Sequence, residues 1–306
     1  MSPDPLDARV RAAAFAWLTQ QVDRHGDVLP RRLLAEGFLF EGIRVPLVGP
    51  QGIFKPRILR DAPLSITTAP EGPYDDGYGP DGLLRYRYRG TVPLHPDNRG
   101  LRAAMVRALP LAYFKGIIPG KYIAIWPVFV VADDPANLTF SIAVDDPAIL
   151  SGVLTSGSVR EETSAARRLY ITATVRRRLH QRTFRERVLD AYRRQCAFCR
   201  LRHEELLDAA HIIPDPEPAG EPVVPNGLAL CSLHHAAFDR YFLGLRPDYT
   251  LEVRRDILEE DDGPVLVHAL QRLHGTRIIV PREHALQPDP ALVEARYQRF
   301  RDAMPR

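Results

Sequence analysis

Three cysteines and one histidine in the second half of the chain have the spacing of a metal site. The stretch CAFC holds Cys196 and Cys199, and the stretch CSLH holds Cys231 and His234. Two close pairs of soft or borderline ligands suit the tetrahedral coordination of zinc. Three cysteines give no disulfide framework, and all of them are used here. We therefore predict a structural zinc site that four protein ligands close.

Four polar residues near these pairs are surplus to a four-coordinate zinc. His211 lies in AAHIIP, which has the pattern of a strand ending at a proline, and Asn226 lies in a turn before the next strand. His235 and Asp239 are four residues apart, so one helix face presents both. A hard divalent cation such as Mg²⁺ prefers oxygen ligands and tolerates imidazole. We predict that these residues form one small site.

The elements that must position this site are predicted from local patterns. The stretch RTFRERVLDAYRRQ is a helix that leads into the first cysteine pair, and a compact metal module follows to about Leu245. The tail is predicted to contain two strands, YTLEVRR and TRIIVP, and a final helix from about Pro290.

The order AHIIP, NGLALC and HHAAFD resembles the HNH nucleases, which have a ββα-metal fold. The resemblance covers about residues 192–245. It implies that His211 is the general base for a water that attacks a backbone phosphorus. It also implies that His235 and Asp239 hold the catalytic Mg²⁺ or another divalent cation, which neutralises charge on the phosphorane and on the leaving 3′ oxygen.

Two positions of this resemblance stay open. Asn226 would either orient the loop that carries His211 or add a ligand. Many HNH sites have a metal ligand immediately before the base, but that position is Ala210 here, and the nearest acid is Asp208. Either Asp208 serves as a cation ligand or water fills the position. The alternative for Asp208 is a turn or capping residue.

Sequence patterns indicate a soluble, intracellular protein rather than a membrane protein, and the charge distribution leaves DNA binding open. The longest apolar run is YIAIWPVFVVA, far shorter than the roughly 20 residues that a membrane helix needs. The start, MSPDPLDARV, has no signal-peptide pattern. The net charge is only +3, but residues 160–202 contain thirteen arginines against four acidic residues. This strip is either a solvated helical face or a surface that follows the phosphate backbone.

The front half has the pattern of a β-rich domain between helices. A helix is predicted over residues 6–24, and a short one opens at Pro30 and ends at Gly37. Short runs rich in Val, Ile, Tyr and Phe then alternate with Gly, Pro and Asp clusters up to about Val144, as in IRVPLV, LLRYRYRG, KYIAIWPVFVV and LTFSIAV. A helix is predicted near NRGLRAAMVRAL.

Part of this domain resembles the SRA (YDG) domain, a β-barrel that flips modified cytosine out of DNA. The resemblance covers about residues 49–145 and depends on EGPYDDGYGPDGLLRYRYRGT and the helix after it. A flipped base needs aromatic faces for stacking and a carboxylate for its exocyclic amine. Tyr74 and Tyr88 would stack, with Tyr86 as a competitor, and Asp75 or Asp76 would accept from the cytosine. The alternative is a tyrosine-rich hairpin with a turn-forming Asp-Gly. The stretch QGIFKPR is either a DNA-contacting loop or ordinary surface basicity.

The sequence thus predicts an α+β chain with an SRA-like β-barrel domain over residues 1–150, a linker over 151–180 and an HNH domain with structural zinc over 181–306. The first functional hypothesis is a type IV-like restriction endonuclease that recognises 5-methylcytosine or 5-hydroxymethylcytosine in double-stranded DNA. The others are a DNA-binding reader with a non-catalytic zinc module and an unselective HNH nuclease. One HNH site cuts one strand, so a double-strand break suggests a homodimer. The expected location is the bacterial cytoplasm, at the nucleoid when DNA is bound.

Overall fold

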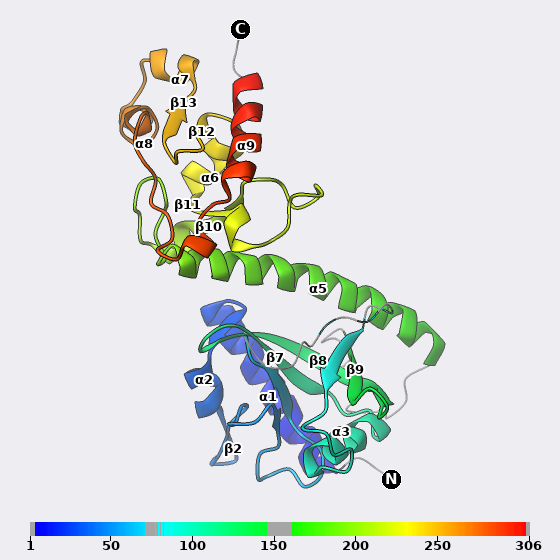
Figure 1. Cartoon of the computed structure of the whole chain (residues 1–306). Helices are drawn as coiled ribbons and strands as arrows, with labels where there is room; N and C mark the ends of the chain where they lie inside the picture. The colour runs from blue at the N-terminus through cyan, green and yellow to red at the C-terminus, as the bar shows by residue number, and fades with distance from the viewer. Residues whose placement is uncertain are drawn as a thin grey trace. The chain divides into compact units, whose positions relative to one another are not determined.

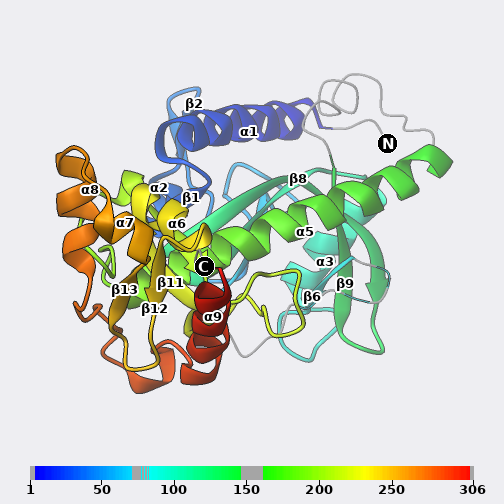
Figure 2. The ribbon, with the colours of Figure 1, turned by 90° about the horizontal axis from the view of Figure 1, so that it is seen from above.

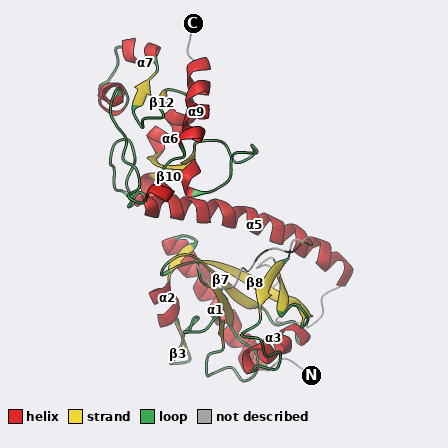
Figure 3. Cartoon of the chain, viewed as in Figure 1, coloured by secondary structure: helices red, strands yellow, loops and turns green. Residues whose placement is uncertain are grey.

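The structure is a computed structural model that describes residues 4–70, 77, 79, 81, 83–145 and 161–303 (Figures 1 and 3). The chain divides into two compact units, Met1–Leu179 and His180–Arg306. In the described ranges, no helix has the length and apolar character needed to cross a membrane.

A curled sheet organises the first unit. Its described strands run in the order β4-β5-β7-β8-β9-β6, and β1 pairs with β8. The β5–β7 pair is parallel and the other pairs are antiparallel. The curl brings the Tyr86 hydroxyl of β6 to the Thr67 carbonyl of β5, at 3.2 Å. The strands are β1 (Val28–Pro30), β4 (Ile53–Phe54), β5 (Ser65–Thr68), β6 (Leu84–Arg87), β7 (Leu111–Ile118), β8 (Lys121–Asp134) and β9 (Thr139–Val144).

Helices α1 (Pro5–His25), α2 (Arg31–Glu36) and α3 (Pro96–Val106) belong to the same unit, with a separate hairpin of β2 (Phe38–Phe40) and β3 (Ile43–Val45). Successive residues of a strand point to opposite sides of the sheet, and here both sides pack in buried cores. In β7, Phe114 joins a core that includes Leu18 of α1, whereas Tyr113 joins a second core that includes Leu101 of α3. Helix α1 therefore lies along one face of the sheet, as Figures 1 and 2 show.

The predicted helices and strands of this unit are largely confirmed. Helix α1 begins after Asp4, whose carboxylate accepts from the Leu6 amide at 3.0 Å, and it ends at Gly26 with a φ of 75°. Helix α2 ends at Gly37, where φ is 62°. The predicted strand runs overlap β3, β6, β8 and β9, and the predicted helix overlaps α3. Seven of the nine described strands of this unit form a curled sheet, and the SRA barrel stays a prediction.

The segment predicted as a linker is only partly described. Residues 151–160 lie outside the described ranges, whereas residues 161–180 belong to α5 (Glu161–Ala191). The predicted helix that leads into Cys196 is therefore the last part of a longer helix. Within α5, Leu179 packs in the core of the first unit and Val188 packs in the core of the second.

The second unit contains the predicted ββα order. Strands β10 (Leu207–His211) and β11 (Gly227–Cys231) are antiparallel, and α6 (Ser232–Asp239) follows directly. The prediction of a strand at TRIIVP is wrong, because Arg277 makes only an isolated bridge to Thr250 and the chain there has no continuous ladder. The remaining elements are β12 (Leu243–Leu245), β13 (Leu251–Val253), α7 (Arg255–Glu259), α8 (Pro264–Ala269), α9 (Pro290–Asp302) and four 3₁₀ turns, η2 (Glu204–Leu206), η3 (Val224–Asn226), η4 (Gln271–Leu273) and η5 (His284–Leu286).

Candidate metal centre and active site

The four predicted zinc ligands lie together in the second unit. Their ligand atoms are all within 4.8 Å of one another. The Cys199 and Cys231 sulfurs are 4.0 Å apart, and the His234 Nδ1 atom is 3.4 Å from the Cys196 sulfur and 3.2 Å from the Cys231 sulfur. With Zn–S bonds of about 2.3 Å and Zn–N bonds of about 2.0–2.1 Å, tetrahedral ligand atoms lie roughly 3.5–3.8 Å apart. The donor set and its spacing fit zinc.

Backbone geometry and a hydrogen bond hold these ligands in place. The turn after Cys196 closes through the Arg200 amide, which donates to the Cys196 carbonyl at 2.9 Å, with Arg200 at a φ of 66°. Cys231 ends β11 and caps α6, so His234 follows in the first turn of that helix. The His234 Nε2 atom lies 2.7 Å from the Ala269 carbonyl. Donation from Nε2 to that carbonyl leaves Nδ1 free to face the sulfurs, as in metal-binding histidines generally.

His211 ends β10 in a half-buried position. Its ring stacks on Phe184 of α5, with centroids 4.1 Å apart and planes at 17°. Its Nε2 atom is buried and has no hydrogen-bond partner in the described part of the chain. Burial lowers the pKa of His211, although the nearby carboxylates of Asp215 and Asp239 act in the opposite direction. The imidazole is therefore neutral around pH 7 and able to accept a proton.

Asn226 is fully buried and binds backbone rather than pointing into an open site. Its Oδ1 accepts from the Ile213 amide at 2.8 Å. Its Nδ2 donates to the Ile213 carbonyl at 2.9 Å and to the Glu221 carbonyl at 3.0 Å. Both ends of the amide are thus used to hold the chain two residues after His211. Of the two roles predicted for Asn226, this geometry suits the orienting one.

Asp208, His235 and Asp239 form a chain of ion pairs within electrostatic reach of His211. The His235 Nδ1 atom is 3.5 Å from the Asp208 carboxylate, and its Nε2 atom is 3.3 Å from the Asp239 carboxylate. The pairing with Asp208 raises the pKa of His235, against the effect of burial. For Asp208, burial is opposed by His235, and the net effect is a lowered pKa. Asp208 and His235 therefore both favour their charged forms.

Residues 196–246 match the HNH endonuclease family. The chain thus contains an HNH endonuclease domain, and the match supports a DNA-hydrolysing nuclease. The modification-dependent TagI restriction endonuclease is similar in structure, with a TM-score of 0.28 and 16% identity, covering 94% of this chain and 90% of that one. The type IV phosphorothioation-dependent restriction endonuclease ScoMcrA has a TM-score of 0.19 and 16% identity, covering 78% of this chain and 56% of that one. No curated protein matches.

The donor types of the HNH domain suit a second, harder cation. Two carboxylates and an imidazole are ligands that Mg²⁺ or Mn²⁺ accepts. In this structure Asp208 and Asp239 lie at opposite edges of the His235 ring and do not converge. Among the described side chains, the Cys₃His group is the one cluster of three or more potential ligands. The predicted cation ligands are therefore neighbours that would need to rearrange around a bound ion.

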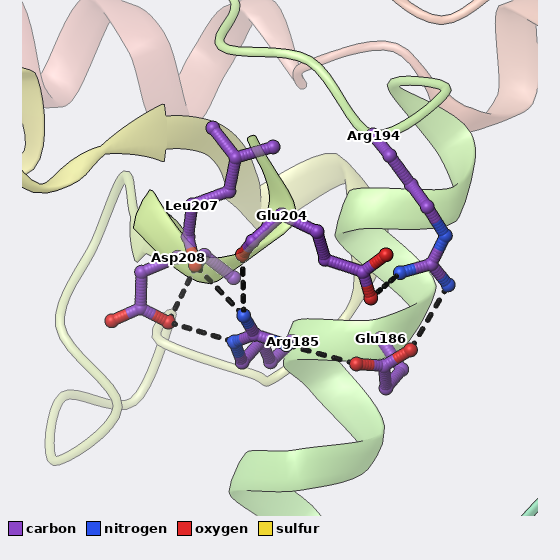
Figure 4. Close-up of polar contacts among 7 residues, drawn as sticks. Arg185, Glu186, Arg194, Glu204, Leu207 and Asp208 are labelled. Atoms are coloured by element: carbon purple, nitrogen blue, oxygen red, sulfur yellow. Dashed lines mark hydrogen bonds and ion pairs between the residues drawn. The ribbon is translucent and has the colours of Figure 1, made fainter. Parts of the chain in front are cut away.

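Sequence reasoning missed the residues that α5 contributes to the HNH domain. Phe184 supports the His211 ring, and the Arg185 Nε atom lies 3.6 Å from the Asp208 carboxylate. Figure 4 shows Arg185 between the carboxylates of Asp208 and Glu186, beside the Leu207 carbonyl at the start of β10. The sequence signal was the high arginine density of residues 160–202, which did not single out one position.

The predicted base pocket of the first unit is only partly described. Tyr74, Asp75 and Asp76 lie outside the described residues. Tyr86 and Tyr88 are buried, and their hydroxyls donate to the Thr67 carbonyl and to the Asp133 carboxylate. The Arg102 guanidinium lies over the Tyr88 ring, 5.2 Å from its centroid. In this conformation neither ring offers an open face for stacking.

Proposed function

We propose that the chain is a modification-dependent restriction endonuclease in which the HNH domain hydrolyses a phosphodiester bond of DNA. The observation that carries the proposal is the arrangement in the second unit. A neutral, stacked His211 lies within electrostatic reach of the Asp208–His235–Asp239 chain. A closed zinc site would not require any of these four side chains.

In the proposed mechanism, His211 takes a proton from the attacking water. Its Nε2 atom is closed off, so Nδ1 is the nitrogen that a water would reach. Phe184 holds the plane of the ring, and Asn226 holds the backbone that follows it. Both contacts restrict the imidazole to one orientation, which favours proton transfer from a positioned water.

The cation site of this proposal consists of His235 with the carboxylates of Asp208 and Asp239. A divalent cation bound there would neutralise charge on the phosphorane and on the leaving 3′ oxygen. The ligand residues come from β10 and from one face of α6. Opening the present ion pairs would free carboxylate oxygens for a cation. His235 would have to lose its proton to become a ligand.

For recognition, we propose that the first unit selects 5-methylcytosine or 5-hydroxymethylcytosine by base flipping. The support is the resemblance of the Tyr74–Asp76 stretch and its surroundings to the SRA motif. Since Tyr86 and Tyr88 are buried, Tyr74 becomes the preferred stacking residue, with Asp75 or Asp76 as the partner of the cytosine amine. Two HNH sites, as in a homodimer, would be needed to cut both strands.

The test compares cleavage of matched duplexes that carry cytosine, 5-methylcytosine or 5-hydroxymethylcytosine, at fixed salt and with Mg²⁺. We expect the full chain to cut a modified duplex faster than the unmodified one. His211→Ala should lower the rate by about 10²–10⁴-fold while DNA binding and zinc content stay near wild type. A wild-type rate in His211→Ala would exclude the proposed base.

A second candidate function is an unselective HNH nuclease. The burial and hydrogen bonding of Tyr86 and Tyr88 favour it, because they remove two of the predicted stacking surfaces. Equal cleavage of modified and unmodified duplexes would support this second function. Binding of modified DNA without cleavage under any cation would instead indicate a reader with a non-catalytic zinc module.

A further inference from the structure

Arg185 connects helix α5 to the start of strand β10. Its NH2 atom donates to the Leu207 carbonyl at 2.8 Å and to the Glu204 carbonyl at 3.4 Å. Its NH1 atom donates to the Glu186 carboxylate at 2.9 Å. Two ends of the guanidinium thus bind groups whose positions are already set by buried structure. The remaining nitrogen, Nε, faces Asp208 at 3.6 Å.

The two oxygens of Asp208 face different partners. Oδ1 lies toward Arg185 and also accepts from the Ala209 amide at 2.8 Å, whereas Oδ2 lies toward His235. The Ala209 amide and the Arg185 guanidinium thus both lie at Oδ1, and Oδ2 is the oxygen that faces His235. The Asp208 side chain is about half exposed, at 52%, and that of Arg185 is 23% exposed. An exposed carboxylate has several rotamers of similar energy, so a fixed neighbour has a large influence on its orientation.

We propose that Arg185 is a positioning residue that holds the Asp208 carboxylate toward His235. The proposal rests on the proposed function, in which Asp208 is a ligand of the catalytic cation. It extends the nuclease site beyond residues 196–246, the part that matches the HNH family. The last turns of α5 then belong to the working site as well as to the core.

Arg194 provides a matched control because it belongs to the same network without contacting Asp208. It donates to the second Glu186 oxygen at 3.0 Å and to the Glu204 carboxylate. Its side chain is as exposed as that of Arg185, at 23%. Figure 4 shows the two arginines on either side of Glu186. A purely structural role would make loss of Arg194 resemble loss of Arg185.

The experiment measures Mn²⁺ binding by isothermal titration to the full, zinc-loaded chain, with zinc content and melting temperature recorded in parallel. The variants are Arg185→Met, Arg194→Met, Asp208→Asn and the double variant Arg185→Met/Asp208→Asn. We expect Arg185→Met to weaken Mn²⁺ binding by about tenfold or more, as for other residues that orient a metal ligand. Arg194→Met should bind Mn²⁺ like the wild type. The double variant should bind no more weakly than Asp208→Asn, because both changes affect one ligand.

Three results would overturn the proposal: unchanged Mn²⁺ affinity in Arg185→Met, an equal loss in Arg194→Met, or losses that multiply in the double variant. If Arg185→Met does not fold, Arg185→Lys decides. Lysine keeps the charge but lacks the forked donors, so the Arg185→Lys variant should bind Mn²⁺ more weakly than the Arg194→Met variant. Equal Mn²⁺ affinity of these two variants would overturn the proposal. If the wild type and Asp208→Asn bind Mn²⁺ equally, Asp208 is not a cation ligand and this proposal fails. The nuclease function is tested separately, by DNA cleavage.

Discussion

Replacement of Asn226 by alanine should destabilise the HNH domain strongly. The side chain is fully buried and makes three hydrogen bonds, one to the Ile213 amide and two to the Ile213 and Glu221 carbonyls. Each buried backbone group left without a partner costs about 1–3 kcal/mol, so the Ile213 amide and carbonyl together give roughly 2–6 kcal/mol. The Glu221 carbonyl is only partly buried and adds less. Water that enters the space would favour the lower half of this range. A loss of this size is a large part of the 5–15 kcal/mol that is typical of a whole domain.

Asn226→Asp keeps the shape of the side chain but places a carboxylate oxygen against two carbonyl oxygens. The buried carboxylate should therefore have a folded-state pKa above its unfolded value of about 3.9. With a raised folded pKa, the folded state binds more protons than the unfolded state. Stability relative to the wild type is then lost as pH rises from the unfolded pKa through the folded pKa. The deficit of Asn226→Asp should accordingly be larger at pH 8 than at pH 5.5.

Thermal unfolding of the zinc-loaded chain measures both effects. We expect Asn226→Ala to lower the melting temperature of the second unit by at least about 10 °C and to reduce cleavage, because the chain after His211 loses its support. Asn137→Ala is the control, since Asn137 is exposed and its side-chain amide donates to the Asp134 carboxylate in a surface turn. A melting temperature within about 3 °C of the wild type would refute this account of Asn226. A pH-independent deficit in Asn226→Asp would refute the orientation of its amide.

Three further predictions concern the metal site, the base and its support. Cys199→Ser should reduce the bound zinc below one per chain and unfold the second unit, because zinc binding there is largely folding energy; elemental analysis with circular dichroism measures both, and full zinc content would contradict it. Burial lowers the pKa of His211 from its ordinary 6.5, and the base must be neutral. At saturating Mg²⁺, where His235 would already be a neutral ligand, the acidic limb of kcat/KM should therefore have its midpoint below pH 6.5, and a midpoint above 6.5 would contradict this. Gly227→Ala places a Cβ 2.5 Å from Val188 Cγ2 and 2.9 Å from Phe184 Cζ. This crowding should destabilise the domain by about 1–3 kcal/mol and slow cleavage, whereas the control Gly263→Ala, with open space around its Cβ, should do neither. Equal melting temperatures for the two variants would contradict this prediction.

The parts of the site that were predictable from sequence are those encoded by local spacing. Cys196 and Cys199 lie in one tight turn, and Cys231 and His234 span the junction of β11 and α6. The spacing within each pair determines how close its ligands lie, and the order of strand, turn and helix brings the two pairs together. The end of α2 was predictable for the same reason, because Gly37 follows a short helical pattern and glycine readily adopts the positive φ that ends a helix.

The parts that were not predictable depend on contacts between residues distant in sequence. Phe184 meets the His211 ring only because α5 packs under the β10–β11 hairpin. Arg185 is one of many arginines in its stretch, and only the packing of α5 selects it as the neighbour of Asp208. The burial of Tyr88 has a similar origin, since its partners Asp133 and Arg102 come from β8 and α3. Aromatic and charged residue types indicate chemistry, but their burial depends on tertiary structure.

The zinc site and the proposed cation site are coupled through consecutive residues of α6. His234 faces the cysteine sulfurs, and His235, the next residue, faces Asp208. Successive residues of a helix differ by about 100° in direction, given 3.6 residues per turn. A zinc ion bound by His234 would therefore fix the rotation of α6, and this rotation would direct His235 toward β10. A metal that only holds the fold would thus also determine where the proposed nuclease chemistry can take place.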